Sequence, residues 1–112
     1  MDLYWIHNPA DVARWTPLLE SGRIRHVGVS NHNLAEIALA DGILGEAGFR
    51  VEAVQNHYSL TYRSSERVGI IGHCREHDVR FFSYMVLEQG AMTGRYSPAN
   101  PCATASCRSC GR

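Results

Sequence analysis

Residues 24–33 read IRHVGVSNHN, a short apolar run followed directly by a cluster of polar side chains. Three other apolar runs of the chain end in a similar way. The four predicted strands are Leu3–Ile6, Ile24–Val29, Val51–Val54 and Val79–Ser83, and the residues that follow them are His7, Ser30, Gln55 and Tyr84. These four residues are 23, 25 and 29 positions apart, the length of a strand plus a returning helix. The spacing predicts repeated strand–helix units.

The segments between the predicted strands carry signals for helices. Asn33 has Glu36 three positions later, which is the form of a helix cap, and apolar residues follow with helical spacing. Ser64 or Ser65 is suited to cap the next helix, which is expected to end at His77. The second and third intervals are therefore predicted to be helices that return the chain to the start of the next strand.

The first interval carries the weakest helix signal, because Pro17 lacks the N–H group that a helix interior uses. It favours only a short helix that begins at Thr16 or Pro17. Alternating strands and helices imply a parallel sheet with right-handed crossovers, so the predicted fold class is α/β. The carboxyl ends of parallel strands lie at one edge of the sheet, where binding and catalytic residues gather. We expect the polar residues that follow the strands to meet there.

These polar residues suit a planar ligand that bears an amide. They include no nucleophile with a general base and no carboxylate pair, which disfavours hydrolase and glycosidase chemistry. Asn31 and Gln55 match the acceptor oxygen and the donor hydrogens of a nicotinamide carboxamide, and Ser30 adds a hydroxyl contact. Tyr84 is expected to lie against the ring, and His7 to donate a hydrogen bond to a substrate carbonyl oxygen.

Helix capping is the alternative interpretation, since Asn and Ser often follow a strand only to satisfy free N–H groups. Capping accounts well for Asn33, whereas Gln55 is a poor cap. His32 and His57 lie at the same predicted edge, where they are candidates to line the site, but the preferred interpretation of both is a solvated loop residue.

The composition excludes several classes of protein. The 112 residues are 45% hydrophobic, and eleven basic and eleven acidic residues cancel to a formal charge of zero. We therefore expect no nucleic-acid or membrane partner, since both need an excess of positive charge. All eleven basic residues are arginine, so a mechanism that uses a lysine of this chain is excluded. No apolar stretch is long enough to span a membrane and no leader opens the chain, which favours a cytoplasmic protein.

Four ordered blocks stand out along residues 2 to about 96. They read DLYWIH at 2–7, VGVSN at 27–31, VQN at 54–56, and FSY at 82–84 continued by GAMTGRY at 90–96. Together they resemble successive blocks of the aldo-keto reductases, in the order and at roughly the spacing of that family. The resemblance implies strands four to seven of a TIM (β/α)8 barrel, about half of the barrel, and the reduction of aldehydes and ketones with NADPH.

The resemblance also implies roles for individual residues. His7 is similar to the histidine that orients the carbonyl substrate, Ser30, Asn31 and Gln55 to the residues that hold the nicotinamide carboxamide, and Tyr84 to the aromatic residue that stacks on the ring. The family's catalytic aspartate, tyrosine and lysine lie upstream of the matched blocks. The chain is therefore expected to be truncated at both ends and, on its own, catalytically incomplete.

The predicted organisation is a partial barrel over residues 1–96 and a disordered, cysteine-containing tail over residues 97–112. Cys107 and Cys110 form a C-x-x-C pair, with Cys102 before them, but no second pair accompanies them, so no metal site is predicted. Three alternatives to an oxidoreductase stay open. The chain is a nonenzymatic remnant that associates through open sheet edges, a small α/β binding module, or a thiol or zinc module.

Overall fold

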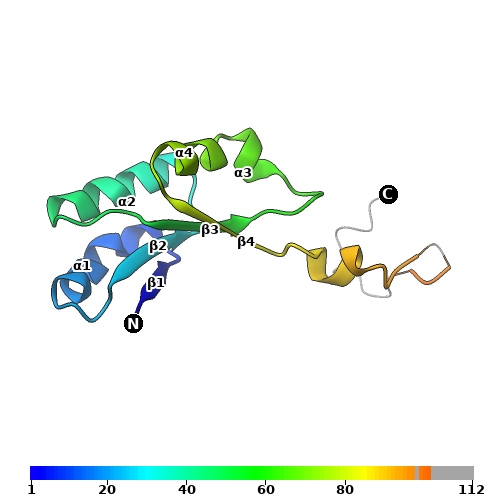
Figure 1. Ribbon diagram of the computed structural model, residues 1–112, viewed down its shortest axis with the longest axis horizontal. Helices are drawn as coiled ribbons and strands as arrows, with labels where there is room; N and C mark the ends of the chain where they lie inside the picture. Colours follow the sequence, from blue (N-terminus) through cyan, green and yellow to red (C-terminus); the bar gives the residue numbers. More distant parts are fainter. Residues whose placement is uncertain (98, 102–112) are drawn as a thin grey trace.

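The computed structural model describes residues 1–97 and 99–101, and the body of this part is a parallel sheet with helices between its strands (Figure 1). The strands, hydrogen-bonded in chain order, are β1 (Leu3–Ile6), β2 (His26–Ser30), β3 (Ala53–His57) and β4 (Arg80–Tyr84). The helical segments are η1 (Pro9–Asp11), α1 (Val12–Glu20), α2 (Leu34–Glu46), α3 (Ser64–Arg67), α4 (Ile70–Glu76) and η2 (Glu88–Thr93). The predicted α/β class with parallel strand–helix repeats is confirmed.

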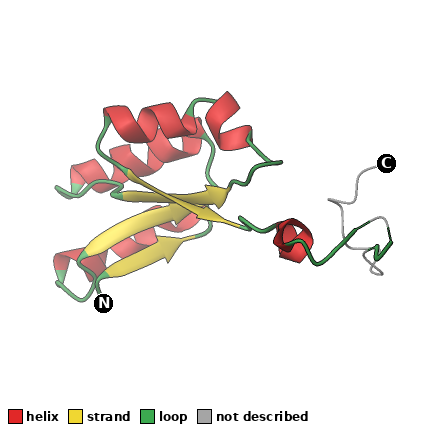
Figure 2. Ribbon diagram, turned by 45° about the vertical axis from the view of Figure 1, so that its right-hand side comes forward, coloured by secondary structure: helices red, strands yellow, loops and turns green. Residues whose placement is uncertain are grey.

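The two faces of the sheet differ because successive side chains of a strand point to opposite sides. One face, the covered face, carries Ile6, Val27, Val29 and Val54, each at most 1% exposed. These side chains form a single hydrophobic cluster with apolar residues of the helices. Figure 2 shows these helices beside the sheet. The cluster includes Val12 and Leu19 of α1, Ile37, Ala40 and Leu44 of α2, and Ile70 and Cys74 of α4. The core of the described chain therefore lies between the covered face and these helices.

The alternate residues of the same strands make up the open face. In register they are Leu3 and Trp5 of β1, His26, Gly28 and Ser30 of β2, Ala53, Gln55 and His57 of β3, and Arg80, Phe82 and Tyr84 of β4. Trp5 and Phe82 pack edge to face here, with ring centroids 5.3 Å apart, and Phe82 stays 41% exposed. Polar residues lie at both ends of this face: His26 and Arg80 are at the amino ends of β2 and β4, whereas Ser30, Gln55 and Tyr84 lie towards the carboxyl ends of the strands.

The first connection corrects the sequence prediction, because α1 runs from Val12 to Glu20 and contains Pro17. The short helix predicted to begin at Thr16 or Pro17 is wrong. The chain turns helical earlier because the Asn8 side chain accepts a hydrogen bond from the N–H of Ala10 at the start of η1. Burial of two α1 side chains in the core then outweighs the cost of an interior proline, since each stabilises by about 1.5–3 kcal/mol.

The second connection confirms its predicted cap. The Asn33 side chain accepts from the N–H of Glu36 at 3.0 Å, and the Glu36 carboxylate accepts from the N–H of Asn33 at 2.8 Å. This reciprocal pair fixes the beginning of α2, directly after the polar cluster that ends β2. Asp41 of the same helix accepts from the N–H of Val51 at 2.8 Å and so helps to align the chain that enters β3.

The third connection is helical but is divided into two helices. Gly69 has φ +85° between α3 and α4, in the left-handed region that glycine enters without steric cost. Neither Ser64 nor Ser65 caps, because α3 begins after Arg63 and has no side-chain cap. The predicted end of the helix is confirmed, since His77 closes α4.

The carboxyl end of the third strand also differs from the prediction. β3 continues to His57, so Gln55 lies inside the strand rather than after it.

Beyond β4 the chain runs through η2 away from the sheet (Figure 1). The predicted boundary at residue 96 stays a prediction, since residues 98 and 102–112, with the three tail cysteines, lie outside the described residues. Among the described helices, none has the length and apolar character needed to cross a membrane.

Candidate functional site

The carboxyl edge of the sheet brings His7, Ser30 and Gln55 to one level, and Tyr84 lies two residues further along, opposite His57. Ile6, the last residue of β1, pairs with Val29 of β2, so His7 follows at the level of Ser30. Ser30 in turn pairs with Gln55 of β3. His7 is exposed and Ser30 is 2% exposed, so the imidazole is open to a ligand while the hydroxyl lies within the protein.

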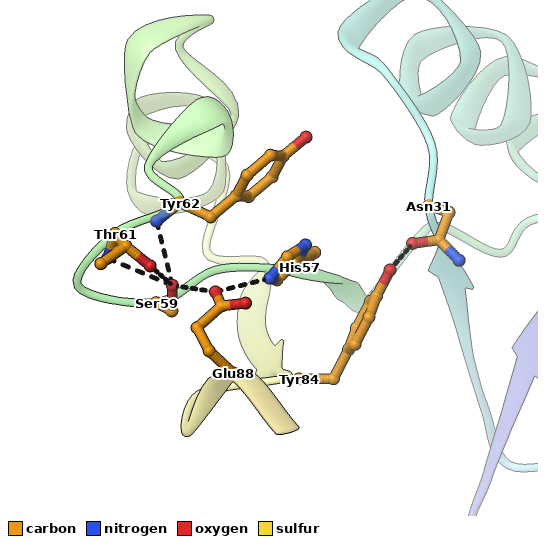
Figure 3. A network of polar contacts seen from close by, with 7 residues as sticks. All are labelled: Asn31, His57, Ser59, Thr61, Tyr62, Tyr84 and Glu88. Atoms are coloured by element: carbon orange, nitrogen blue, oxygen red, sulfur yellow. Dashed lines mark hydrogen bonds and ion pairs between the residues drawn. The ribbon is translucent and has the colours of Figure 1, made fainter. Parts of the chain in front are cut away.

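Hydrogen bonds join four of the predicted residues across β2, β3 and β4. The Tyr84 hydroxyl donates to Oδ1 of Asn31 at 2.5 Å, which links β4 to the end of β2 (Figure 3). The backbone N–H of Asn31 donates to the carbonyl oxygen of Gln55 at 3.0 Å. The Ser30 hydroxyl is 3.5 Å from Oε1 of Gln55, at the limit of a hydrogen bond. The structure therefore brings Ser30, Asn31, Gln55 and Tyr84 together as the sequence predicted.

These hydrogen bonds determine which side-chain atoms of Asn31 and Gln55 stay available to bind a ligand. Both amide oxygens, Oδ1 of Asn31 and Oε1 of Gln55, face a hydroxyl of the protein. The amide nitrogens of the same two side chains make no hydrogen bond within residues 1–97 and 99–101. The edge thus presents N–H donors, which is the arrangement that receives a carbonyl oxygen of a ligand.

The Tyr84 ring belongs to a column of three rings. His57 lies between Tyr62 and Tyr84, with centroids 4.1 Å from Tyr62 and 5.6 Å from Tyr84, and both pairs are stacked (Figure 3). Stacking against His57 fixes the orientation of the Tyr84 ring. Sequence reasoning took His57 for a solvated loop residue; this is wrong, because its side chain is only 25% exposed.

Glu88 holds the His57 ring, the middle one of the three, by a hydrogen bond. Its Oε1 accepts from Nε2 of His57 at 2.9 Å and from the hydroxyl of Ser59 (Figure 3). These hydrogen bonds, that from Ser59 first, lower the pKa of the Glu88 carboxyl below its ordinary value. Ser59 is 3% exposed and donates its proton to this carboxylate, so it is a structural clamp rather than a nucleophile. Sequence reasoning missed the pair because 31 positions separate His57 from Glu88.

A second pair of polar residues lies beneath the turn that ends β2. His32 is 2% exposed, so its interpretation as a solvated loop residue is wrong. Its Nδ1 lies 2.8 Å from the carbonyl oxygen of Ser30, and Asn56 donates through Nδ2 to the carbonyl oxygen of His32 at 3.0 Å. The repeated Asn-His pairs after the predicted strands were the one signal in the sequence for this buried contact.

A cavity of about 380 Å³ opens at the same edge. Its lining comprises Asn31, His32, Asn33, Asn56, His57, Tyr62, Ser64, Ser65, Val68, Ile70 and Tyr84.

In the described part of the chain, no three His, Cys, Asp or Glu side chains gather as a metal site. Burial raises the pKa of the Cys74 thiol, so this cysteine is a poor nucleophile.

Comparison with known proteins agrees with this geometry. The sequence model of the aldo/keto reductase family matches residues 1–110. A chloroplastic pyridoxal reductase of Arabidopsis thaliana is 32% identical over 80 residues, which are 71% of this chain and 22% of that protein. The aldo-keto reductase yakc [NADP(+)] of Schizosaccharomyces pombe is 30% identical over 108 residues, 86% of this chain and 29% of that protein. The chain thus spans less than a third of these relatives.

Solved structures share the fold. The glycerol dehydrogenase AKR11B4 of Gluconobacter oxydans superposes with a TM-score of 0.80 at 23% identity, over 97% of this chain and 34% of its own. The thermostable aldo-keto reductase Tm1743 superposes with a TM-score of 0.67 at 26% identity, over 80% of this chain and 34% of its own. The four strands are therefore part of a TIM barrel, as the sequence predicted. Ordered strands, a polar carboxyl edge and a match over nearly the whole sequence lead to one conclusion: the chain belongs to the aldo/keto reductase family.

Proposed function

We propose that this chain carries the nicotinamide-binding part of an NADPH-dependent oxidoreductase that reduces aldehydes or ketones. The observation that carries the proposal is the meeting of two carboxamides, a buried hydroxyl and a fixed tyrosine ring at one edge of the sheet. The relative from Schizosaccharomyces pombe has NADP(+) in its name, and a related structure, Gox0644 D53A, is a complex with NADPH. Both favour the phosphorylated nicotinamide cofactor.

The available atoms fit a nicotinamide. The free amide N–H groups of Asn31 and Gln55 donate to the carboxamide oxygen of the cofactor. Ser30 supports this contact from within the protein, since its buried hydroxyl lies 3.5 Å from Oε1 of Gln55. The heterocycle stacks on the side of the Tyr84 ring that points away from His57, while His57 supports the ring from its other side. NADPH, when bound, supplies a hydride for a carbonyl carbon.

His7 is the proposed substrate-orienting residue. It is exposed at the end of β1, beside the strand that carries Ser30 and Asn31. From this position an imidazole N–H donates to the carbonyl oxygen of a substrate and fixes the direction from which the carbonyl carbon is approached. This role polarises and orients the carbonyl but provides no dedicated acid for the alkoxide.

The chain alone is expected to have little or no turnover. The catalytic tyrosine and lysine implied by the family resemblance have no assigned counterpart in it, and the sequence holds no lysine. A positioned acid typically contributes about 10²–10⁴-fold to the rate, so its loss leaves binding intact and chemistry slow. Following NADPH absorbance with a reactive aldehyde checks this expectation. Consumption at ordinary enzyme rates that depends on His7 would contradict it.

Cofactor binding is tested with a variant that removes the amide donor of Asn31 and with a control variant that adds the same negative charge. Asn31→Asp keeps an oxygen for the Tyr84 hydroxyl and tolerates the positive φ of this position, but it removes the N–H donors. Asn8→Asp adds the same charge at the same edge and keeps an oxygen to cap η1. In a fluorescence titration with NADPH, we expect Asn31→Asp to weaken affinity about tenfold or more and Asn8→Asp to change it little. Equal affinity of the two variants would contradict the proposal.

Association of two copies is a second candidate activity, favoured by the outer strands of the described sheet. β1 and β4 each leave one edge unpaired, and Phe82 is 41% exposed on the open face. Two copies that join β4 to β1 would pair all four edges as eight strands and cover both open faces. Light scattering during gel filtration would then report twice 12.5 kDa at high concentration. The mass of one chain at every concentration would exclude this association.

A further inference from the structure

We propose that His32 is a positioning residue for the cofactor site, because its ring holds the turn that presents Asn31. The inference rests on the proposed function, in which Asn31 receives the nicotinamide carboxamide. His32 is 2% exposed beneath the turn and offers almost no surface for a ligand to contact, although it belongs to the lining of the cavity at this edge. Its effect on binding is therefore expected to pass through the neighbouring backbone.

The turn needs external support. Asn31 has φ +60°, a left-handed conformation that residues other than glycine adopt at a steric cost, although asparagine tolerates it better than most. The Asn31 side chain is on the surface, and its one side-chain hydrogen bond in the described structure is that from the Tyr84 hydroxyl. The direction of its amide nitrogen therefore depends on how firmly the backbone on either side of residue 31 is held.

His32 supplies one of these supports. Its Nδ1 lies 2.8 Å from the carbonyl oxygen of Ser30, and because that oxygen can only accept, Nδ1 must carry the proton. The ring therefore closes a loop around Asn31, from the residue after it to the residue before it. Asn56 completes the support by donating to the carbonyl oxygen of His32 at 3.0 Å from the adjacent strand.

The surroundings of the other ring nitrogen, Nε2, distinguish a positioning role of His32 from a role in core packing alone. Nε2 of His32 is buried and has no hydrogen-bond partner in the described part of the chain. A buried acceptor without a partner is unfavourable, so packing alone would be served better by an aromatic ring without nitrogen. The polar ring is therefore best explained by the hydrogen bond that Nδ1 makes to the turn.

Two substitutions distinguish these roles. His32→Phe keeps a planar ring and removes the donor, whereas His32→Asn keeps an N–H donor at the position of Nδ1 and loses ring volume. If His32 only fills space, His32→Asn is the more damaging change. If it positions the turn, His32→Phe weakens the NADPH affinity about tenfold while His32→Asn stays within about threefold of the wild-type chain. The order of the two variants thus reverses between the roles.

The experiment is a fluorescence titration of the 112-residue chain with NADPH, combined with urea unfolding and with NMR of the Asn31 side-chain amide. We expect His32→Phe to lose affinity although its urea midpoint falls no further than that of His32→Asn, and to shift the Asn31 amide resonances. Wild-type affinity in His32→Phe, or unchanged Asn31 resonances, would overturn the inference. If the wild-type chain itself binds no NADPH, the proposed function fails, and the Asn31 resonances alone then decide whether His32 holds the turn.

Discussion

The covered and the open face of the sheet are built from alternate residues of the same strands, yet they differ in composition and in exposure. Val29 and Val54 of the covered face are completely buried among aliphatic side chains. Their direct neighbours Ser30 and Gln55, on the open face, carry hydrogen-bonding groups at the carboxyl edge. One strand therefore supplies both the core and the candidate site, one residue apart.

This difference indicates that stability and binding are separable in this chain. Changes on the covered face remove apolar burial, which dominates the free energy of folding. Changes at the carboxyl edge of the open face remove single hydrogen bonds whose net contribution to folding is about 1 kcal/mol each. We therefore expect substitutions to fall into two classes, and the following predictions test that division.

The largest expected effect is in the core between the covered face and the helices. Leu44→Ala removes a completely buried side chain of α2 and leaves a cavity, so the free energy of unfolding is expected to fall by about 2–5 kcal/mol. Leu39→Ala on the same helix removes a side chain that is 58% exposed and is expected to cost less than about 0.5 kcal/mol. Urea unfolding followed by circular dichroism measures both. Similar losses in the two variants would show that α2 does not pack as described.

A smaller effect is expected where the open face is tightly packed. A Cβ at Gly28 would lie 2.6 Å from Cε3 of Trp5 and 3.1 Å from Cβ of Ala53. Gly28→Ala must therefore displace the indole, at a cost of about 1–3 kcal/mol, and change the tryptophan fluorescence. Gly42→Ala, inside α2 with no atom within 4 Å of the new Cβ, is expected to stabilise by about 0.5–1 kcal/mol. Effects of the same sign would contradict the described approach of Trp5 to Gly28.

The smallest expected effect is the pH dependence of stability that Glu88 contributes through its hydrogen bonds with His57 and Ser59. Because its hydrogen bonds lower the pKa of Glu88 in the folded chain, the carboxylate stabilises the fold above its unfolded pKa of about 4.3. This contribution is lost as the pH falls through the lower, folded value. Urea midpoints measured between about pH 6 and pH 3 should therefore fall less steeply in Glu88→Gln than in the wild-type chain. Parallel curves would show that Glu88 is not held as described.

The sequence predicts best what depends on neighbours along the chain. The bounds of β1, the reciprocal cap of Asn33 and Glu36, and the end of α4 at His77 follow from local patterns. Strand spacing also places Ser30, Asn31, Gln55 and Tyr84 at one edge, because the carboxyl ends of parallel strands lie on the same side of a sheet. These residues were predictable without coordinates.

Contacts between distant positions were not predictable in the same way. Asn31 and Tyr84 are 53 positions apart, and their hydrogen bond depends on the stagger of three strands. The extension of α1 through Pro17 depends on tertiary burial that outweighs a local signal. The burial of His32 depends on the packing of the turn that ends β2, where a polar residue would ordinarily be solvated.

The central claim is that the carboxyl edge of the open face receives the nicotinamide ring, and saturation-transfer NMR of NADPH with the folded 112-residue chain tests it most directly. We predict the strongest transfer to the nicotinamide protons and its reduction in Asn31→Asp but not in Asn8→Asp. Transfer confined to the adenine protons, or equal transfer in the two variants, would contradict the account.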